Sequence, residues 1–422
     1  MKILVRNREH GGALAVTLIT CLLIGIVMAS YLDLVGSRYK ITIRSQCWNA
    51  AIPVAEAGIE EALAHLHDDS NAPAANNWTQ GMISGQTVYS KQRTNSDGTY
   101  FLANLYYSGT NDPYIYGTGF VPSPLDPASY ISRSIRVTCT NPPTFSFGIA
   151  AIYDLTMTGS GPYFASDSYD SSNPLLSSNG QYVASMATTN GNVASVYGPV
   201  NLGNHTIAGN LSLGPSIDPN NIGSGTILGQ TYTDFNASFA DAQLPPVLTN
   251  ALLQSPPNIQ TNTYIFDTSG AYKISNPGYS LLVLPGVNVQ VRCDATAFNP
   301  AMIHVLQSSN GISGTLNLYQ VSGTMTLNGG AIVDSGSAVN FLYYGLPGVT
   351  SIGLGGSSTF YGAIYAPEAD ITLNGGGSAN NFCGAVVGKT ITMKGHYNIH
   401  FDQALLQYGP KRGYVAASWR EM

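Results

Sequence analysis

The chain begins with a long stretch of apolar residues that carries no charge. Residues 11–32 (GGALAVTLITCLLIGIVMASYL) contain no Asp, Glu, Lys or Arg. At a rise of about 1.5 Å per residue, a helix of this length spans roughly 30 Å, the thickness of the hydrocarbon core of a bilayer. The pattern therefore predicts one membrane-spanning helix, whose membrane residues include Ala13, Leu14, Leu18, Leu22, Ile26 and Leu32.

A second periodic segment follows directly. Its apolar residues recur at alternating steps of four and three, at Trp48, Ile52, Ala55, Ile59, Ala62 and Leu66. This spacing places them on one side of a helix, so residues 13–67 are predicted to form one helix that spans the membrane at its start and is amphipathic at its end. Because Pro53 lacks a backbone donor, we expect the helix to bend there.

The pattern changes to strand-like alternation after residue 67. Residues 68–77 (DDSNAPAANN) are polar, and residues 88–138 alternate between apolar and polar in several strand-sized runs. Strict alternation in residues 132–139 (SRSIRVTC) places Ile135 and Val137 on one face of a strand. Residues 68–143 are therefore predicted to form a small β-rich module that ends at two consecutive prolines.

The rest of the chain contains an internal repeat. Residues 147–161 (FGIAAIYDLTMTGSG), 360–376 (FYGAIYAPEADITLNGG) and 382–396 (FCGAVVGKTITMKGH) share a Phe, a Gly-Ala-like start and a similar end, and residues 322–330 (SGTMTLNGG) repeat the second half. The last two full copies lie about 22 residues apart, near the length of one β-solenoid coil. The predicted fold class is mostly β with an N-terminal α-helix, including a right-handed β-helix over residues 144–408 and a C-terminal tail over 409–422. A β-sandwich is the alternative.

Composition and charge narrow the possible partners. Asp, Glu, Lys and Arg make up only 9% of the residues, whereas the chain has 46 Gly and 26 Tyr. Polarity therefore comes from hydroxyl and amide groups, which suits short strands joined by tight turns. The formal net charge is −6, and basic residues cluster only near the N-terminal end, so we expect no binding to nucleic acid.

Patterns that could bind a metal ion are weak. His396, His400 and Asp402 are the best candidates, because alternate residues of a strand share a face. The apolar residues between them fit equally well a last strand with one solvent-facing side, and we expect no metal. Asp167 and Asp170 lie in a segment without the calcium-loop pattern, which predicts a turn built from Asx side chains.

The sequence predicts neither a catalytic site nor a cofactor. It contains no nucleophile elbow, phosphate loop, zinc-protease motif or dinucleotide fingerprint in a fitting context, and we expect no enzyme activity. The five cysteines lack Cys-x-x-Cys or Cys/His spacing, which predicts scattered buried thiols with at most one disulfide. Whether Cys139, Cys293 or Cys383 takes part in a disulfide stays open.

Charges around the apolar run predict its orientation. Lys2, Arg6 and Arg8 precede the run and favour a cytoplasmic N-terminus, whereas three basic residues within 38–44 favour the opposite. The composition and length of the following chain favour translocation of the C-terminal side. A cleaved secretory signal is the competing interpretation, but the run is longer than a typical signal core and continues into a second helical segment.

A short basic leader ending in glycine (residues 1–12), an apolar helix and the Ala-Glu-Ala-Gly of residues 55–58 resemble the N-terminus of type IV pilus accessory pilins of the PilX type. The resemblance implies peptidase cleavage after Gly12, with Ala13 as the first mature residue. Thr17 stands where such pilins carry a glutamate that neutralises a neighbour's terminal amine in an apolar bundle. Two interpretations stay open: a subunit at the tip of a filament, or an uncut membrane protein.

Several segments of the C-terminal half are similar to an uncharacterised domain, DUF7305, that often follows PilX-like N-termini in bacterial envelope proteins. They are residues 166–172 (SDSYDSS), 361–375 (YGAIYAPEADITLNG), 383–395 (CGAVVGKTITMKG) and 400–407 (HFDQALLQ). The resemblance covers most of residues 147–422. It implies a β-helical, non-catalytic module at the cell surface or on a pilus.

These patterns predict a single-pass protein of the bacterial inner membrane whose bulk is periplasmic, otherwise extracytoplasmic or extruded at the cell surface. Its expected function is that of a structural or adhesive accessory of type IV pilus or secretion-pseudopilus assembly, with the lipid bilayer, other pilin-like subunits and surface glycans as partners. The alternative is a membrane-anchored carbohydrate-active β-helix enzyme. A carboxylate cluster in a groove would favour the enzyme, and a neutral groove lined by Tyr would favour the structural or adhesive role.

Overall fold

The computed structural model describes residues 10–68, 73–108, 112–124, 126–158, 164–250, 252–328, 332–334, 336–356, 360–375, 380–395, 397–409 and 414–422. The protein is mostly β, with one long apolar helix at its N-terminal end. It divides into two compact units: unit 1 comprises residues 1–141 and 413–422, and unit 2 comprises residues 142–412. Neither of the two described sheets closes on itself.

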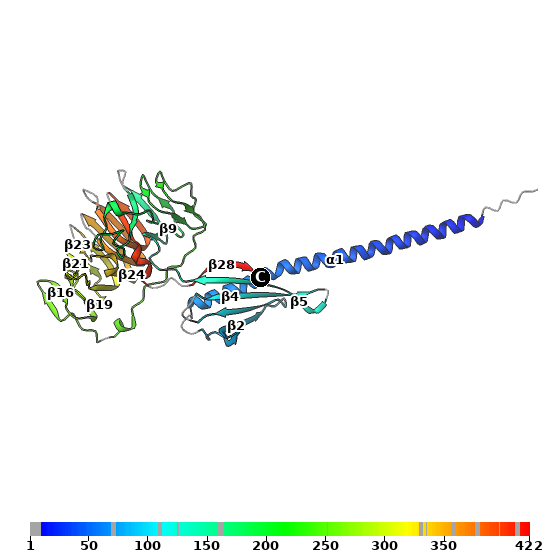
Figure 1. Ribbon diagram of the computed structural model, residues 1–422, viewed down its shortest axis with the longest axis horizontal. Coiled ribbons are helices and arrows are strands. Elements are labelled where there is room, and N and C mark those ends of the chain that lie inside the picture. The colour runs from blue at the N-terminus through cyan, green and yellow to red at the C-terminus, as the bar shows by residue number, and fades with distance from the viewer. Residues whose placement is uncertain are drawn as a thin grey trace, which may run out of the picture. The chain divides into compact units, whose positions relative to one another are not determined.

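Unit 1 consists of one helix and one antiparallel sheet (Figure 1). The helix, α1, spans His10–Asp68. The described strands pair in the order β1-β2-β3-β4-β5-β28, and every pair is antiparallel. Their bounds are Thr79–Ile83 (β1), Gln86–Thr94 (β2), Tyr100–Tyr106 (β3), Tyr114–Ser123 (β4), Asp126–Thr140 (β5) and Val415–Glu421 (β28).

The C-terminal part of α1 packs against one face of this sheet. Alternate residues of β3 and β4 are buried, as the period of two along a strand requires. The hydrophobic residues of α1 that are buried are Cys47, Ala51, Ala55, Ile59, Ala62 and Leu66. The predicted face is thus confirmed for its last four positions. At the start of the docked part, however, Trp48 is 48% exposed and Cys47 is buried in its place.

Two glycines of β4 explain this difference. A Cβ atom on Gly117 would lie 2.5 Å from the carbonyl oxygen of Ala55, and one on Gly119 would lie 2.5 Å from the Ala55 nitrogen and still nearer to Ala51. Because both positions lack a side chain, the backbone of α1 reaches the sheet along Ala51 and Ala55. The helix continues through Pro53, which is exposed.

The end of the chain completes the sheet of unit 1. The sequence predicts a tail over residues 409–422, whereas residues 415–421 form β28, which pairs antiparallel with β5 (Figure 1, red beside cyan). Arg133 of β5 forms an ion pair with Glu421 of β28. Unit 2 is therefore inserted between two adjacent strands of unit 1, a pairing that local sequence patterns cannot reveal.

Unit 2 is built from strands that pair parallel to one another, with the exception of β15 and β16. The strands of its first part are Ile149–Ala151 (β6), Leu155–Thr158 (β7), Phe164–Tyr169 (β8), Val193–Ser195 (β9), Val200–Asn201 (β10), Thr206–Ile207 (β11), Leu211–Leu213 (β12), Thr226–Ile227 (β13) and Thr231–Tyr232 (β14). The strands of its second part are Asn258–Gln260 (β15), Thr263–Phe266 (β16), Gly270–Ile274 (β17), Ser280–Val283 (β18), Asn288–Cys293 (β19), Ala297–Phe298 (β20), Met302–Val305 (β21), Thr315–Leu327 (β22), Ile332–Asp334 (β23), Phe341–Gly356 (β24), Phe360–Gly375 (β25), Asn380–Lys394 (β26) and Tyr397–Asp402 (β27).

The copies of the internal repeat lie side by side in register. Phe360 of β25 pairs with Phe382 of β26, and Ile391 of β26 pairs with Leu155 of β7. The ends of the copies, together with Leu354 of β24, form one continuous buried row of apolar side chains, made of Leu327, Leu354, Leu373, Met393 and Met157. The repeat therefore encodes the apolar interior of the stack, in which each strand buries its neighbours.

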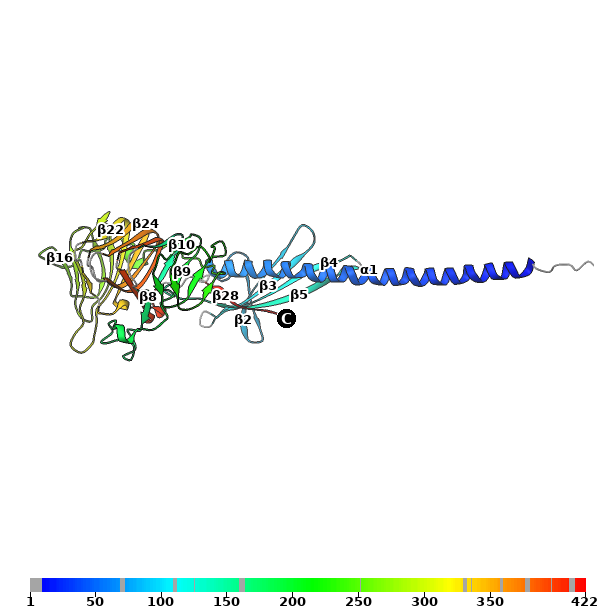
Figure 2. The ribbon, with the colours of Figure 1, turned by 90° about the horizontal axis from the view of Figure 1, so that it is seen from above.

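The two ends of unit 2 meet in the middle of the stack. β26 pairs with β25 and also with β6, β7 and β27, and β27 pairs with β8. In Figure 1 and Figure 2 the orange and red strands accordingly lie between green and yellow ones. Unit 2 therefore starts in the middle of the stack with β6 and runs outward to β14. It then crosses to β15 at the other end and returns through β26 and β27 to the middle. One layer is thus assembled from the last strand of unit 2 and its first two.

The segment between β14 and β15, residues 233–257, makes this crossing and is called the crossing segment. It covers the outside of the stack. Phe235, Phe239 and Ala242 belong to a hydrophobic cluster that also contains Tyr344 of β24 and Tyr365 of β25. The hydroxyl of Tyr365 donates a hydrogen bond to the carbonyl oxygen of Ala240. Both faces of β24 and β25 are buried here, so these strands lose the usual alternation of buried and exposed residues.

Candidate functional site

The N-terminal part of α1 is an apolar surface that no described residue covers. The segment 12–66 is the one described helix long and apolar enough to cross a membrane. Ala13 is exposed. The other predicted membrane residues are each more than half exposed, namely Leu14, Leu18, Leu22, Ile26 and Leu32. An apolar surface of this extent is consistent with a single membrane span.

The predicted processing site lies at the start of this helix. Gly12 and Ala13 fall within its first turn, because α1 begins at His10. Residues 1–9, which hold the basic part of the leader, lie outside the described residues. The hydroxyl of Thr17 donates to the carbonyl oxygen of Leu14 at 3.0 Å. Its polar group is therefore satisfied within the helix, and the apolar surface contains no charge.

The candidate metal ligands do not form a cluster. His396 lies outside the described residues, and His400 and Asp402 on β27 are only 5% and 0% exposed. The solvent-facing side that the sequence predicts for this strand is thus absent from its described end, because neighbouring segments cover both faces. Among the described residues, no three His, Cys, Asp or Glu side chains lie close enough together to hold a metal ion.

His400 forms a buried hydrogen-bonded group instead. Its Nδ1 lies within hydrogen-bonding distance of Asp167 on β8, whose other carboxylate oxygen accepts a hydrogen bond from the Tyr182 hydroxyl at 2.8 Å. The Tyr182 ring stacks on the imidazole with centroids 3.6 Å apart, and Nε2 lies 3.1 Å from Asn381 Oδ1. The polar atoms of these four side chains pair with one another, so the cluster joins β27 to β8.

Asp402 has a structural role as a helix cap. Its Oδ1 accepts hydrogen bonds from the backbone nitrogens of Ser171 at 2.9 Å and Ala404 at 3.1 Å, the latter at the start of the 3₁₀-helix η4 (Gln403–Gln407). Burial raises the pKa of this carboxyl group above its ordinary value. Its Oδ2 has no hydrogen-bond partner among the described residues. The carboxyl group is therefore costly to ionise.

The segment from Asp170 on forms turns, as predicted, whereas Asp167 lies in the strand β8 and contacts His400 instead. The carboxylate of Asp170 accepts a hydrogen bond from the backbone nitrogen of Ser172 at 2.9 Å, and Asn173 Oδ1 accepts one from the nitrogen of Leu175 at 3.0 Å. Both are Asx turns, in which the side-chain oxygen replaces a backbone acceptor. Their oxygens are thus used locally.

All five cysteines are free thiols in this structure. Cys21 is exposed on the apolar part of α1, and the other four are buried. Burial raises the pKa of Cys139 and of Cys293 to about 12, and it raises the pKa of Cys383 further. Because the thiolate is the reactive form, these three side chains are unsuited to nucleophilic chemistry.

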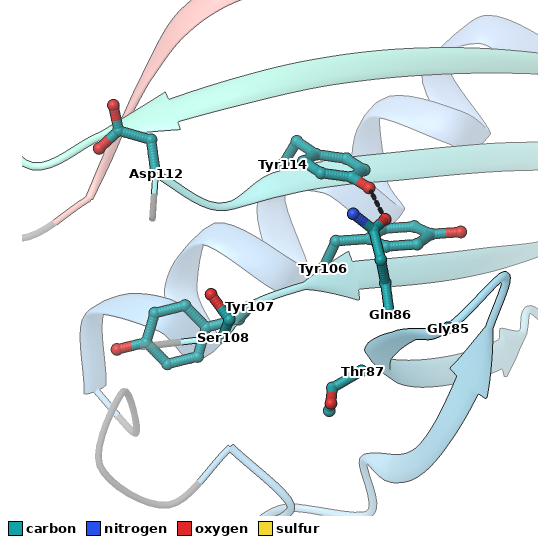
Figure 3. Close-up of a pocket in the computed structure, with 8 residues that line it drawn as sticks. All are labelled: Gly85, Gln86, Thr87, Tyr106, Tyr107, Ser108, Asp112 and Tyr114. Carbon is teal, nitrogen blue, oxygen red and sulfur yellow. Dashed lines mark hydrogen bonds between the residues drawn. The ribbon is translucent and has the colours of Figure 1, made fainter. Parts of the chain in front are cut away.

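Unit 1 contains a pocket of about 280 Å³ at one end of its sheet (Figure 3). The rings of Tyr106 and Tyr114 stack with centroids 4.4 Å apart, and the guanidinium carbon of Arg136 lies 4.8 Å from the centre of the Tyr114 ring. The Tyr114 hydroxyl donates to Gln86 Oε1. The aromatic faces and the amide oxygen of this pocket are therefore already engaged with one another.

Unit 2 contains a larger groove of about 640 Å³ between the crossing segment and the outside of the stack. Residues 240–243 form one wall, and Tyr319 of β22, Tyr344 of β24 and Tyr408 form much of the other. The rings of Tyr319 and Tyr344 stack with centroids 4.6 Å apart. Asp241 is the one charged residue among the described residues that line the groove.

Sequence reasoning predicts Tyr-rich surfaces but does not locate this groove. Its residues come from positions 240–243, 317–344 and 407–409. They meet only because unit 2 crosses the outside of its own stack and places its last strand in the middle of that stack. The described lining of the groove contains three Tyr side chains and one carboxyl group, that of Asp241.

Comparison with known proteins identifies one domain. Residues 287–408 match a family described as Domain of unknown function (DUF7305). The match covers less than half of the chain, and the resemblance proposed for residues 147–286 lies outside it. No curated protein and no solved structure matches the chain.

Proposed function

We propose that the protein is a single-pass, pilin-like protein of the bacterial inner membrane that acts as a structural or adhesive accessory in type IV pilus or secretion-pseudopilus assembly. In this proposal the N-terminal part of α1 lies in the bilayer or among the apolar helices of other pilin-like subunits. Units 1 and 2 lie outside the cytoplasm, and unit 2 supplies the surface that contacts partners or glycans.

The division of α1 into two parts carries this proposal. None of residues 12–46 is buried, and residues 12–32 are uncharged, whereas the following part docks on an antiparallel sheet. The two parts of α1 therefore suit two different environments. The C-terminal part packs on the sheet of unit 1, and the N-terminal part suits an apolar medium such as a bilayer or a bundle of apolar helices. This organisation agrees with the resemblance to PilX-type accessory pilins.

Thr17 supports a position at the end of a filament. A subunit in the filament body carries a glutamate at this place to compensate a neighbour's terminal amine, because an uncompensated charge in an apolar bundle is costly. The hydroxyl of Thr17 is occupied by the carbonyl oxygen of Leu14 and carries no charge. A tip subunit has no neighbour beyond it and does not need the carboxylate.

We further propose that unit 2 is a right-handed β-helix. The proposal is supported by parallel pairing of β22, β24, β25 and β26 in register and by the continuous apolar row that the repeat supplies. The alternative β-sandwich is built mainly from antiparallel strands. A β-helix would present a long, charge-poor surface that is suited to contact.

Membrane extraction tests the anchor. Replacing Leu22 and Ile26 by Arg places two charges near the centre of the apolar run, at a cost of about 2.5–3.5 kcal/mol each. We expect this double variant to leave the membrane fraction under alkaline carbonate, whereas the wild type and a control with Tyr39→Arg and Thr42→Arg stay. Retention of the Leu22/Ile26 variant in the membrane would contradict the anchor.

N-terminal sequencing of protein recovered from membranes tests the pilin-like part. Ala13 as the first residue would support cleavage by a pilin-type peptidase. A start at Met1 would instead identify an uncut membrane protein, and any other start would remove the main support for the pilus assignment. A Gly12→Leu variant serves as the matched control, since the bulky residue should prevent cleavage without altering the apolar run.

A further inference from the structure

The groove of unit 2 offers polar groups that no described residue uses. The amides of Gln243, Asn317 and Gln407 line it, as do the hydroxyls of Tyr319 and Tyr408. None of these side chains makes a hydrogen bond to another part of the chain that the structure describes. Amide and hydroxyl groups of this kind both donate and accept, which is what a ligand rich in hydroxyls requires.

The groove also offers aromatic surface. The rings of Tyr319 and Tyr344 stack on each other, and both side chains line the groove. The Tyr408 side chain is 44% exposed and makes no ring contact with a described residue. Rings that present one apolar face beside a polar edge suit ligands that are themselves amphipathic, such as pyranose rings with their C–H faces. The pocket of unit 1 differs, because each of its Tyr rings contacts another aromatic ring, whereas the Tyr408 ring contacts none among the described residues.

Charge restricts the ligand further. The described lining contains Asp241 and neither Lys nor Arg. Among the described residues of the lining, an acidic ligand would find no cation to pair with its carboxylate or sulfate groups, and burying such groups unpaired is unfavourable. The volume of about 640 Å³ lies within the range of about 300–1,000 Å³ that is usual for sites of small ligands.

From these observations we infer that the groove binds a neutral oligosaccharide. Tyr319 and Tyr408 stack on its rings, and Gln243, Asn317 and Gln407 bind its hydroxyl groups. The inference deepens the adhesive part of the proposed function and rests on it for the compartment in which the glycan is met. The binding itself depends only on the groove.

Calorimetric titration of the full-length protein tests the inference. The protein is held in a detergent whose headgroup contains no sugar. The neutral probes are hexasaccharides of β-1,4-linked glucose, α-1,4-linked glucose and β-1,4-linked N-acetylglucosamine, and the acidic probe is a hexamer of galacturonic acid. Tyr408→Ala and Asn317→Ala are the diagnostic variants. Tyr153→Ala is the matched control, because Tyr153 is 46% exposed on unit 2 and does not line the groove.

We expect at least one neutral hexasaccharide to bind. Tyr408→Ala should weaken its affinity by about tenfold or more, since 1.4 kcal/mol corresponds to about a factor of ten, and Asn317→Ala by about threefold to tenfold. Tyr153→Ala should leave the affinity unchanged. Equal thermal unfolding of all three variants would show that the losses arise from the groove and not from misfolding.

The inference would be overturned by no binding of any neutral probe, by tighter binding of the acidic hexamer, or by an unchanged affinity in Tyr408→Ala. Self-association of the protein that Tyr408→Ala abolishes would also overturn it, because the groove would then bind a second copy. The titration requires neither membrane insertion nor cleavage after Gly12. A failure here therefore leaves the proposed anchor untouched, and a failure of the extraction test leaves the groove untouched.

Discussion

The contact between α1 and the sheet of unit 1 depends on a position without a side chain. Gly119→Ala introduces a Cβ atom 2.5 Å from the nitrogen of Ala55 and still nearer to the backbone of Ala51, whereas ordinary contacts begin at 3.4 Å. The obstructing atoms belong to a helix backbone, which cannot rotate away as a side chain can. The helix must therefore move from the sheet by about 1 Å.

The cost of this change follows from two opposing effects. Overpacking a core costs about 1–3 kcal/mol, and we expect the upper end because backbone atoms are involved. Replacing Gly by Ala also restricts the unfolded chain, which stabilises by about 0.4–1 kcal/mol. Gly119 does not have a left-handed φ, so no backbone strain adds to the balance. The net expectation is a loss of about 2 kcal/mol in the opening free energy of unit 1.

Hydrogen exchange measured by mass spectrometry on the full-length protein provides the assay. A loss of about 2 kcal/mol should speed the exchange of the β3 and β4 amides by about 30-fold, while peptides from β25 in unit 2 serve as an internal reference. The control is Gly81→Ala in β1, where an added Cβ meets no atom within 4 Å. Equal exchange in the two variants would refute the reasoning, because the clash would then have no energetic consequence.

Three further predictions concern charge and packing. Glu61→Gln should destabilise unit 1 by up to about 1 kcal/mol, because it removes the ion pair with Lys91 at 2.6 Å. The hydrogen bond from Lys91 lowers the pKa of Glu61, so the contribution of this group to the stability of the wild type should be lost as the pH drops through that pKa. Asp402→Asn should leave unit 2 equally or more stable in thermal unfolding at pH 7. Burial raises the pKa of this carboxyl group, so its contribution to the stability of the wild type declines as the pH rises above 3.8. Leu373→Ala should cost unit 2 about 2–5 kcal/mol in denaturant unfolding, and Leu228→Ala at an exposed site should cost almost nothing.

Each of these predictions has a result that contradicts it. A Glu61→Gln protein that keeps the acid dependence of the wild type would show that this ion pair does not link the helix to the sheet. A loss above about 1 kcal/mol in Asp402→Asn at pH 7 would mean that the ionised carboxylate is favourable where it lies. Similar losses in Leu373→Ala and Leu228→Ala would contradict the buried apolar row.

The sequence by itself determined the local elements of this protein. The uncharged run of residues 11–32 specifies an apolar helix, and the alternation in β3 and β4 specifies strands with one buried face. The repeat at residues 360–376 and 382–396 predicted neighbouring strands, and the structure pairs them in register. Such features depend on residues close in the chain, whose periodicity is visible without knowledge of distant partners.

Only the tertiary structure decided which distant segments meet. Nothing local in residues 415–421 marks them as a strand beside β5, and nothing local in His400 marks Asp167, which lies 233 positions earlier, as its partner. Because Gly119 has no side chain, the backbone of α1 approaches the sheet at Ala51 and Ala55, and this contact decides which face of the helix is buried. The Tyr-lined groove exists because the crossing segment packs beside the outside of the stack. The physical reason is that pairing and packing energies belong to pairs of segments, and neither member of a pair carries them alone.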